Sequence, residues 1–155
     1  MLVFISACTP QTVAPGSVPE FTLTLRCTTK GGRLTYFELK PDGSLGYGGG
    51  RFAQQRITEP ALTLSSEQRR EVWQIIEKHD LLSAEGSGLF AGGAASTSYE
   101  LTLRASGRSN SIHAIDDAVP GVKELHDALF KMQADARYGK ALPGLPATRS
   151  GATKP

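Results

Sequence analysis

The most constraining feature of the chain is a run of alternating apolar and polar side chains from Phe21 to Cys27. The odd-numbered residues of this run are apolar, and the even-numbered residues are threonine or arginine. Because successive side chains of a strand point to opposite faces, the alternation predicts a strand with one face in a core and one in water. Such half-buried strands are typical of antiparallel sheets. Cys27 lies on the apolar side, so we expect a buried, unreactive thiol.

Two further stretches have the composition of β-hairpins. Residues 33–47 are rich in β-favouring side chains and are interrupted by Pro41-Asp42-Gly43, a sequence suited to a tight turn. The return strand of this hairpin is predicted to continue through residues 51–58. Residues 98–115 alternate again on both sides of a turn at Ser106-Gly107. The sequence therefore predicts two hairpins.

Two helices are predicted between and after these hairpins. Ser65 and Gln68 form a capping box, so the first helix is expected to begin at Ser65 and to run to about Asp80. Trp73 lies at the edge of its apolar stripe and is expected to be at least half buried. Pro120 suits the first turn of the second helix. The apolar stripes of the two helices comprise Val72, Ile75, Ile76 and His79, and Val122, Leu125, Leu129 and Met132.

The order strands, helix, strands, helix predicts an α+β fold, with an antiparallel sheet from two hairpins and both helices packed on one face. We assign residues 20–136 to a single domain and residues 8–19 to a flexible tether, with a mobile loop at 83–96. Residues 137–155 are predicted to be a disordered basic tail.

The charge of the chain is unevenly distributed. Its formal net charge is +2, but the tail alone contributes Arg137, Lys140, Arg149 and Lys154 and no acid. The remaining basic residues are interspersed with acidic ones, whereas a nucleic-acid binder usually has a basic patch on a folded face. We therefore predict no nucleic-acid partner.

The segment Ile5-Ser6-Ala7-Cys8 resembles the lipobox of bacterial lipoproteins. The resemblance implies that the Cys8 thiol receives a diacylglyceryl group and that the peptide bond before Cys8 is cut. Residues 1–7 would then be a truncated signal-like segment. The implied partner is a membrane, reached through a lipid anchor on Cys8, and the implied location is the periplasmic side of the cell envelope.

Three segments resemble the small bacterial emfourin-like domains and related lipoprotein domains: Leu64-Ser65-Ser66-Glu67-Gln68, Ser98-Tyr99-Glu100-Leu101-Thr102-Leu103, and Val119-Pro120 to Leu129. The resemblance extends over about residues 20–135 and implies an α+β fold. Emfourin-like domains of known activity inhibit thermolysin-type metalloproteases, which makes a protease one candidate partner. The resemblance assigns no inhibitory residue to this chain.

The titratable residues offer few candidates for catalysis or metal binding. His113 with Asp116 and Asp117 could form a small cluster, but a solvated acidic turn before a helix is the favoured interpretation. His126, beside Asp127, is expected on the exposed side of its helix. His79 is expected to be a helix-end residue.

Other motifs are also interpreted as structural. Glu67 and Glu71 are predicted to be part of a surface charge cluster, and Gly48-Gly49-Gly50-Arg51 lacks the Lys and Ser/Thr of a phosphate-binding loop. The spacings of His and Cys match no common metal-site motif. The sequence therefore predicts no catalytic residue, no metal ligand and no cofactor.

The leading hypothesis is a non-enzymatic, lipid-anchored cell-envelope protein with an unknown protein partner. The alternative is a protease inhibitor that acts through an exposed loop or the Gly-rich turn at 48–50. A small hydrolase is a third, less favoured possibility.

Overall fold

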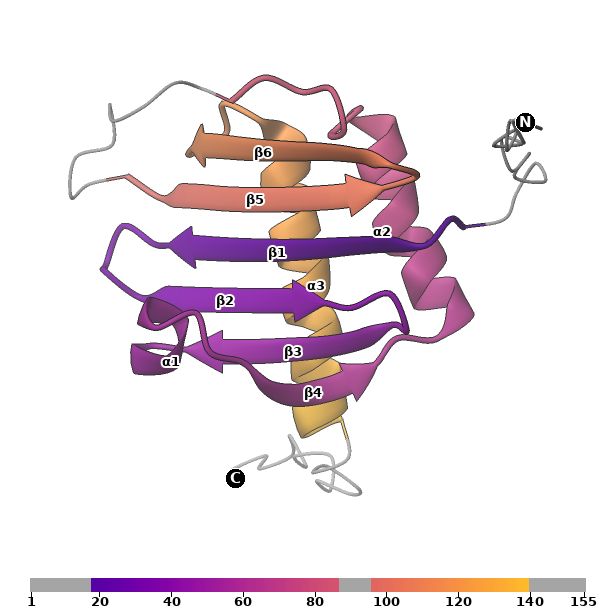
Figure 1. The fold of residues 1–155 in the computed structure, drawn as a ribbon. Coiled ribbons are helices and arrows are strands. Elements are labelled where there is room, and N and C mark those ends of the chain that lie inside the picture. The colour runs from indigo at the N-terminus through magenta and orange to yellow at the C-terminus, as the bar shows by residue number, and fades with distance from the viewer. Residues whose placement is uncertain (1–17, 87–95, 140–155) are drawn as a thin grey trace, which may run out of the picture.

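The computed structural model describes residues 18–86 and 96–139. These residues form six strands and three helices in the order β1 (Phe21–Thr28), β2 (Leu34–Leu39), β3 (Ser44–Gly49), α1 (Arg51–Gln54), β4 (Glu59–Thr63), α2 (Ser66–Lys78), β5 (Ser98–Ala105), β6 (Arg108–Ile115) and α3 (Pro120–Tyr138). The strands form one antiparallel sheet in the order β4-β3-β2-β1-β5-β6. Helices α2 and α3 lie side by side on one face of this sheet (Figure 1).

Strand β1 lies in the middle of the sheet and pairs with β2 on one side and β5 on the other. Leu25 stands opposite Phe37 on β2 and opposite Leu101 on β5, and each of these side chains is at most 1% exposed. The alternation from Phe21 to Cys27 therefore faces the core as predicted, and the α+β fold with an antiparallel sheet is confirmed.

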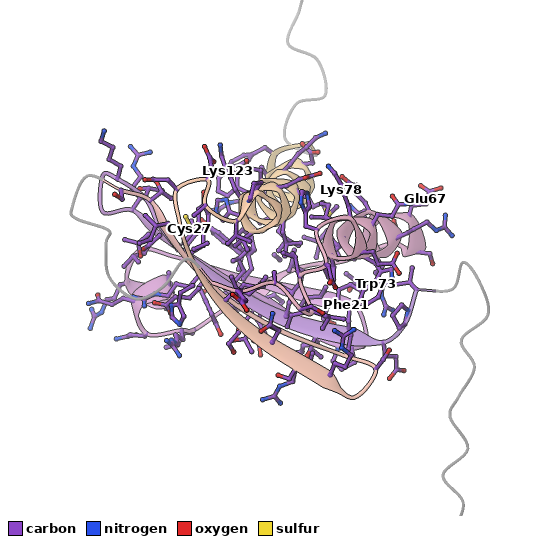
Figure 2. The ribbon with its side chains drawn as sticks, turned by 90° about the horizontal axis from the view of Figure 1, so that it is seen from above. Phe21, Cys27, Glu67, Trp73, Lys78 and Lys123 are labelled. Atoms are coloured by element: carbon purple, nitrogen blue, oxygen red, sulfur yellow. The ribbon has the colours of Figure 1, made fainter. Side chains whose placement is uncertain are left out.

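The two long helices complete the core. The apolar residues predicted to face inward on α2 and α3 are buried. His79, predicted to lie on the same stripe, is the partly exposed C-cap of α2. Trp73 packs partly buried against the core, with its ring centroid 5.4 Å from that of Phe21 (Figure 2). The predicted placement of Trp73 is confirmed.

The predicted capping box is present at the start of α2. The Ser65 hydroxyl accepts a hydrogen bond of 3.2 Å from the Gln68 backbone N–H, and the Gln68 side chain accepts one of 2.9 Å from the Ser65 N–H. The helix ends at Lys78, with His79 as its C-cap.

Replacing Ser65 by alanine is expected to lower the free energy of unfolding by about 1 kcal/mol, because it removes the hydroxyl that accepts from the Gln68 N–H, while the backbone N–H of residue 65 stays in place. The denaturant midpoint measures this change. Ser66→Ala, one residue into the helix, is the matched control. Equal midpoints for Ser65→Ala and the wild type would mean that the cap does not stabilise α2.

The predicted extension of the first hairpin through residues 51–58 is wrong. Gly50 has a φ of +54°, which turns the chain out of β3 and into the short helix α1. The chain then returns as β4, which pairs with β3 across a register shift between Leu45 and Gly46. The described part of the chain therefore has three helices rather than the predicted two. The sheet also gains β4, which lies beyond β2 and β3 at its edge.

The limits of the domain differ slightly from the prediction. Val18 packs against the core, two residues before the expected start, and α3 includes Arg137 and Tyr138 of the predicted tail. Cys8 and the greater part of the predicted tether, loop and tail lie outside the described residues.

Candidate functional site

Helices α2 and α3 lie on one face of the sheet (Figure 1). The opposite face carries polar side chains. Every outward residue of β1 and β5 is polar, in contrast to their buried inward residues. We call this surface the open face. Its central outward side chains are those of Thr22, Thr24, Arg26, Tyr36, Glu38, Glu100, Thr102, Arg104, Ser111 and His113.

Three charged side chains meet on the open face. Glu100 lies opposite Arg26 in the register of β5 and β1, and its carboxylate accepts a hydrogen bond of 3.2 Å from the Arg26 guanidinium. Arg56 donates to the other oxygen of the same carboxylate, also at 3.2 Å. Because two guanidinium groups share one carboxylate, the cluster keeps a net positive charge.

Glycines in β3 allow Arg56 to reach this cluster. A Cβ on Gly46 would lie 2.6 Å from the Thr58 hydroxyl oxygen, and one on Gly48 would lie 2.2 Å from the Ile57 carbonyl oxygen. The chain from α1 to β4 therefore crosses the open face directly above these two residues. Thr58 fixes the crossing by donating a 3.0 Å hydrogen bond to Glu38.

Two adjoining hollows lie along the middle of the open face. One, of about 210 Å³, lies beside Arg26, Arg56 and Glu100. The other, of about 410 Å³, lies beside Lys40 and Arg104. Both are lined by Thr24 and Thr102, so the two hollows adjoin each other, and we call them together the trough.

The prediction that His126 is exposed is wrong. Its side chain is only 13% exposed and lies among the rings of Phe37, Tyr99 and Phe130. Its Nε2 atom is 3.1 Å from the Thr35 hydroxyl oxygen, and its Nδ1 atom is 3.2 Å from a carboxylate oxygen of Asp127. The ring therefore has polar partners at both nitrogens within an aromatic cluster.

The order hydroxyl, imidazole, carboxylate is also that of hydrolytic triads. The Asp127 side chain is 64% exposed, whereas the carboxylate of the triad template is buried. The other nearby nucleophile is Cys27, which hydrogen-bonds Thr35, but burial raises the pKa of its thiol to about 11. This thiol therefore stays protonated and unreactive near neutral pH, as the sequence predicted. We interpret this series of side-chain hydrogen bonds, from Cys27 through Thr35 and His126 to Asp127, as one that stabilises the contact between α3 and the sheet.

A second histidine joins the two long helices. His79 Nε2 lies 2.7 Å from a carboxylate oxygen of Glu124 on α3, and Lys78 donates to the same carboxylate at 3.0 Å. Gly121 permits this contact, because a Cβ there would lie 2.5 Å from the His79 side chain. The hydrogen bond with His79, followed by that with Lys78, lowers the pKa of Glu124 below its usual 4.5.

This lowered pKa makes a pH-dependent contribution to stability. The ionised carboxylate stabilises the folded state above the ordinary pKa, and the contribution disappears as the pH falls through the lowered pKa. Glu124→Gln is therefore expected to unfold more easily than the wild type at pH 7 and equally at pH 2–3. Urea titrations at both pH values measure the difference, with Glu77→Gln as an exposed control on α2. A difference that persists unchanged at low pH would contradict this assignment.

The structure separates His113 from the two aspartates that follow it. His113 is on the open face, whereas Asp116 accepts a 2.8 Å hydrogen bond from the Thr97 N–H and Asp117 pairs with Lys123 at 3.2 Å. The two aspartates stabilise the turn before α3. Within residues 18–86 and 96–139, no group of three or more His, Cys, Asp or Glu side chains is arranged to hold a metal ion.

The other residues that the sequence analysis singled out have structural roles or lie on the exposed surface of α2. Glu67 and Glu71 are exposed on α2, on the helix side of the sheet. Gly48 is covered by the crossing segment, and Gly49 approaches the Tyr47 ring. The part of the Gly-rich turn within β3 is therefore packed against its neighbours.

No protein-family model matches the chain, and no curated protein matches it. Among the residues described, no helix is long and apolar enough to cross a membrane.

Proposed function

We propose that this chain is a non-enzymatic, lipid-anchored domain of the bacterial cell envelope that binds another protein through its open face. The observation that carries the binding role is the polar, charged and hollowed sheet face opposite the two long helices. The anchor would be a lipid on Cys8, as the lipobox resemblance of residues 5–8 implies.

Both edges of the sheet are poorly suited to pairing with a strand of a partner protein. This favours binding through the open face. Along β6, the Asn110 amide donates to the carbonyls of Leu81 and Ala84, so a segment of the chain covers part of this edge. The other edge strand, β4, contains Pro60, which lacks a backbone N–H. A partner strand would therefore find incomplete hydrogen bonding at either edge.

The protease-inhibitor alternative rests on the resemblance to emfourin-like domains. It predicts that the purified domain slows a thermolysin-type protease at stoichiometric concentration. Unchanged hydrolysis of a peptide substrate in the presence of excess domain would remove this alternative.

Position-specific photo-cross-linking in bacteria tests the binding role. A photoreactive amino acid is placed at Thr24 or Thr102 on the open face, and at Glu71 or Lys131 on the helix side as matched controls. We expect a protein adduct from the two sheet positions only. Adducts from the helix positions alone, or from none of the four, would contradict a binding role for the open face.

A further inference from the structure

The trough has positive charge at both ends. Between them lie the hydroxyl side chains of Thr24 and Thr102 and the carboxylate of Glu38, which accepts a hydrogen bond from Thr58. Lys40 and Arg104 lie at one end, and Arg26 and Arg56 lie at the other. We propose that the trough binds an extended acidic segment of the partner protein, with two carboxylates four residues apart. This inference rests on the proposed function and specifies the chemistry of the partner.

The charge balance of the trough favours an anionic ligand. The two hollows are lined by four Lys and Arg residues but only two acidic residues, Glu38 and Glu100. Within the described part of the chain, neither Lys40 nor Arg104 forms a salt bridge, and both are exposed. The described residues as a whole contain 14 Lys and Arg against 15 Asp and Glu. The excess positive charge of the trough is therefore local and not a property of the whole domain.

The spacing of the charges fits an extended polypeptide. Arg104 stands opposite Thr22 in the sheet register, and Glu100, which holds the two arginines at the other end, stands opposite Arg26. These positions are four residues apart along β1, or about 13 Å at the rise of a strand. Side chains at positions 1 and 5 of an extended peptide have the same separation and point to the same side.

The floor of the trough allows the peptide to lie close to the sheet. Thr22, Thr24 and Thr102 provide short side chains with hydroxyl groups that can donate or accept hydrogen bonds. Polar peptide groups entering the trough would therefore find partners along its length.

Binding is tested with a blocked pentapeptide that has glutamate at both ends and alternating threonine and serine between them. The protein is the full chain carrying Cys8→Ser, and binding is followed by changes in its amide NMR signals. We expect the changes to follow the trough residues of β1, β2 and β5, and to weaken as salt is added. The same peptide with glutamine at both ends is the ligand control, and it is expected to leave the signals unchanged.

A pair of double variants locates the binding site. Lys40→Gln with Arg104→Gln is expected to weaken binding by about tenfold, the effect of losing two exposed charge pairs. Arg70→Gln with Lys131→Gln removes the same charge from the helix side and should leave binding unchanged. Equal weakening by both double variants, or equal binding of the glutamine peptide, would overturn the inference.

Two further outcomes separate this inference from the proposed function. If Thr24 cross-links a protein in cells but the glutamate peptide does not bind, the open face is a binding surface and the acidic-segment assignment is wrong. If a heparin oligosaccharide binds the trough and the peptide does not, the ligand is an anionic glycan and the inference is also overturned.

Discussion

Cys8→Ser is expected to move the protein from the membrane fraction to the soluble fraction of bacteria that express it from its natural start. Each buried CH₂ of an acyl chain contributes about 0.8 kcal/mol, so two or three chains hold a protein firmly while one holds it marginally. Serine cannot form the thioether that carries the diacylglyceryl group. Loss of the acyl chains should therefore release the protein or leave it unprocessed.

Cys27→Ser is the matched control for this experiment. Cys27 is 1% exposed on the inward side of β1, between the sheet and α3, where no modifying enzyme can reach it (Figure 2). This variant is therefore expected to keep the location of the wild type. Equal membrane partitioning of wild type and Cys8→Ser, with no lipid mass on the mature wild-type protein, would reject the anchor.

Gly48→Ala is expected to cost about 3 kcal/mol of unfolding free energy, near the upper end for overpacking in a well-packed site. The new Cβ would lie 2.2 Å from the Ile57 carbonyl oxygen, a backbone atom that cannot turn aside as a flexible side chain can. The crossing segment must move, and the contact of Arg56 with Glu100 should loosen with it. Urea unfolding measures the loss of stability, and amide NMR signals around Glu100 report the movement.

Gly31→Ala is the control for an alanine introduced at a glycine. A Cβ at Gly31 has no atom within 4 Å, so we expect a change within about 0.5 kcal/mol. Similar destabilisation by the two substitutions would mean that glycine flexibility, and not the close crossing of residues 57–58, explains the effect at Gly48.

The elements predicted well from the sequence have strong local signals. The alternation from Phe21 to Cys27 determines which side of β1 is buried, and the Ser65 capping box specifies the start of α2 within a few residues. Neither signal depends on distant parts of the chain.

Strand β4 and helix α1 could not be predicted in this way. Glu59–Thr63 does not alternate and contains a proline, so its strand conformation arises from pairing with β3. Helix α1 spans only four residues, too few for a periodic apolar pattern. The sequence predicts a turn at Gly48-Gly49-Gly50, but the space that Gly46 and Gly48 leave for the crossing segment depends on the tertiary structure.

For His126, the position in the helix indicates burial correctly, whereas the polarity of the side chain led to the wrong prediction of exposure. It lies four residues after Val122 and three before Leu129, which places it near the buried stripe of α3. Its polarity suggested exposure, but aromatic rings from β2 and β5 and the Thr35 hydroxyl provide suitable neighbours. These neighbours are brought together only by the packing of α3 on the sheet.

The cluster of Arg26, Arg56 and Glu100 on the open face could not be predicted from the sequence for a similar reason. Arg26 and Glu100 are separated by 74 residues, and their pairing depends on the register between β1 and β5. Strand alternation places each of them on the polar face. Only the register places them opposite each other, and only the crossing segment adds Arg56.

The intact mass of the mature protein, purified from bacterial envelopes, tests the lipid anchor most directly. We predict a chain that begins at Cys8 and carries the mass of a diacylglyceryl group with a further acyl chain, and a Cys8→Ser protein without them. An unmodified chain that still contains residues 1–7, recovered from the same envelopes, would contradict the lipid-anchored function.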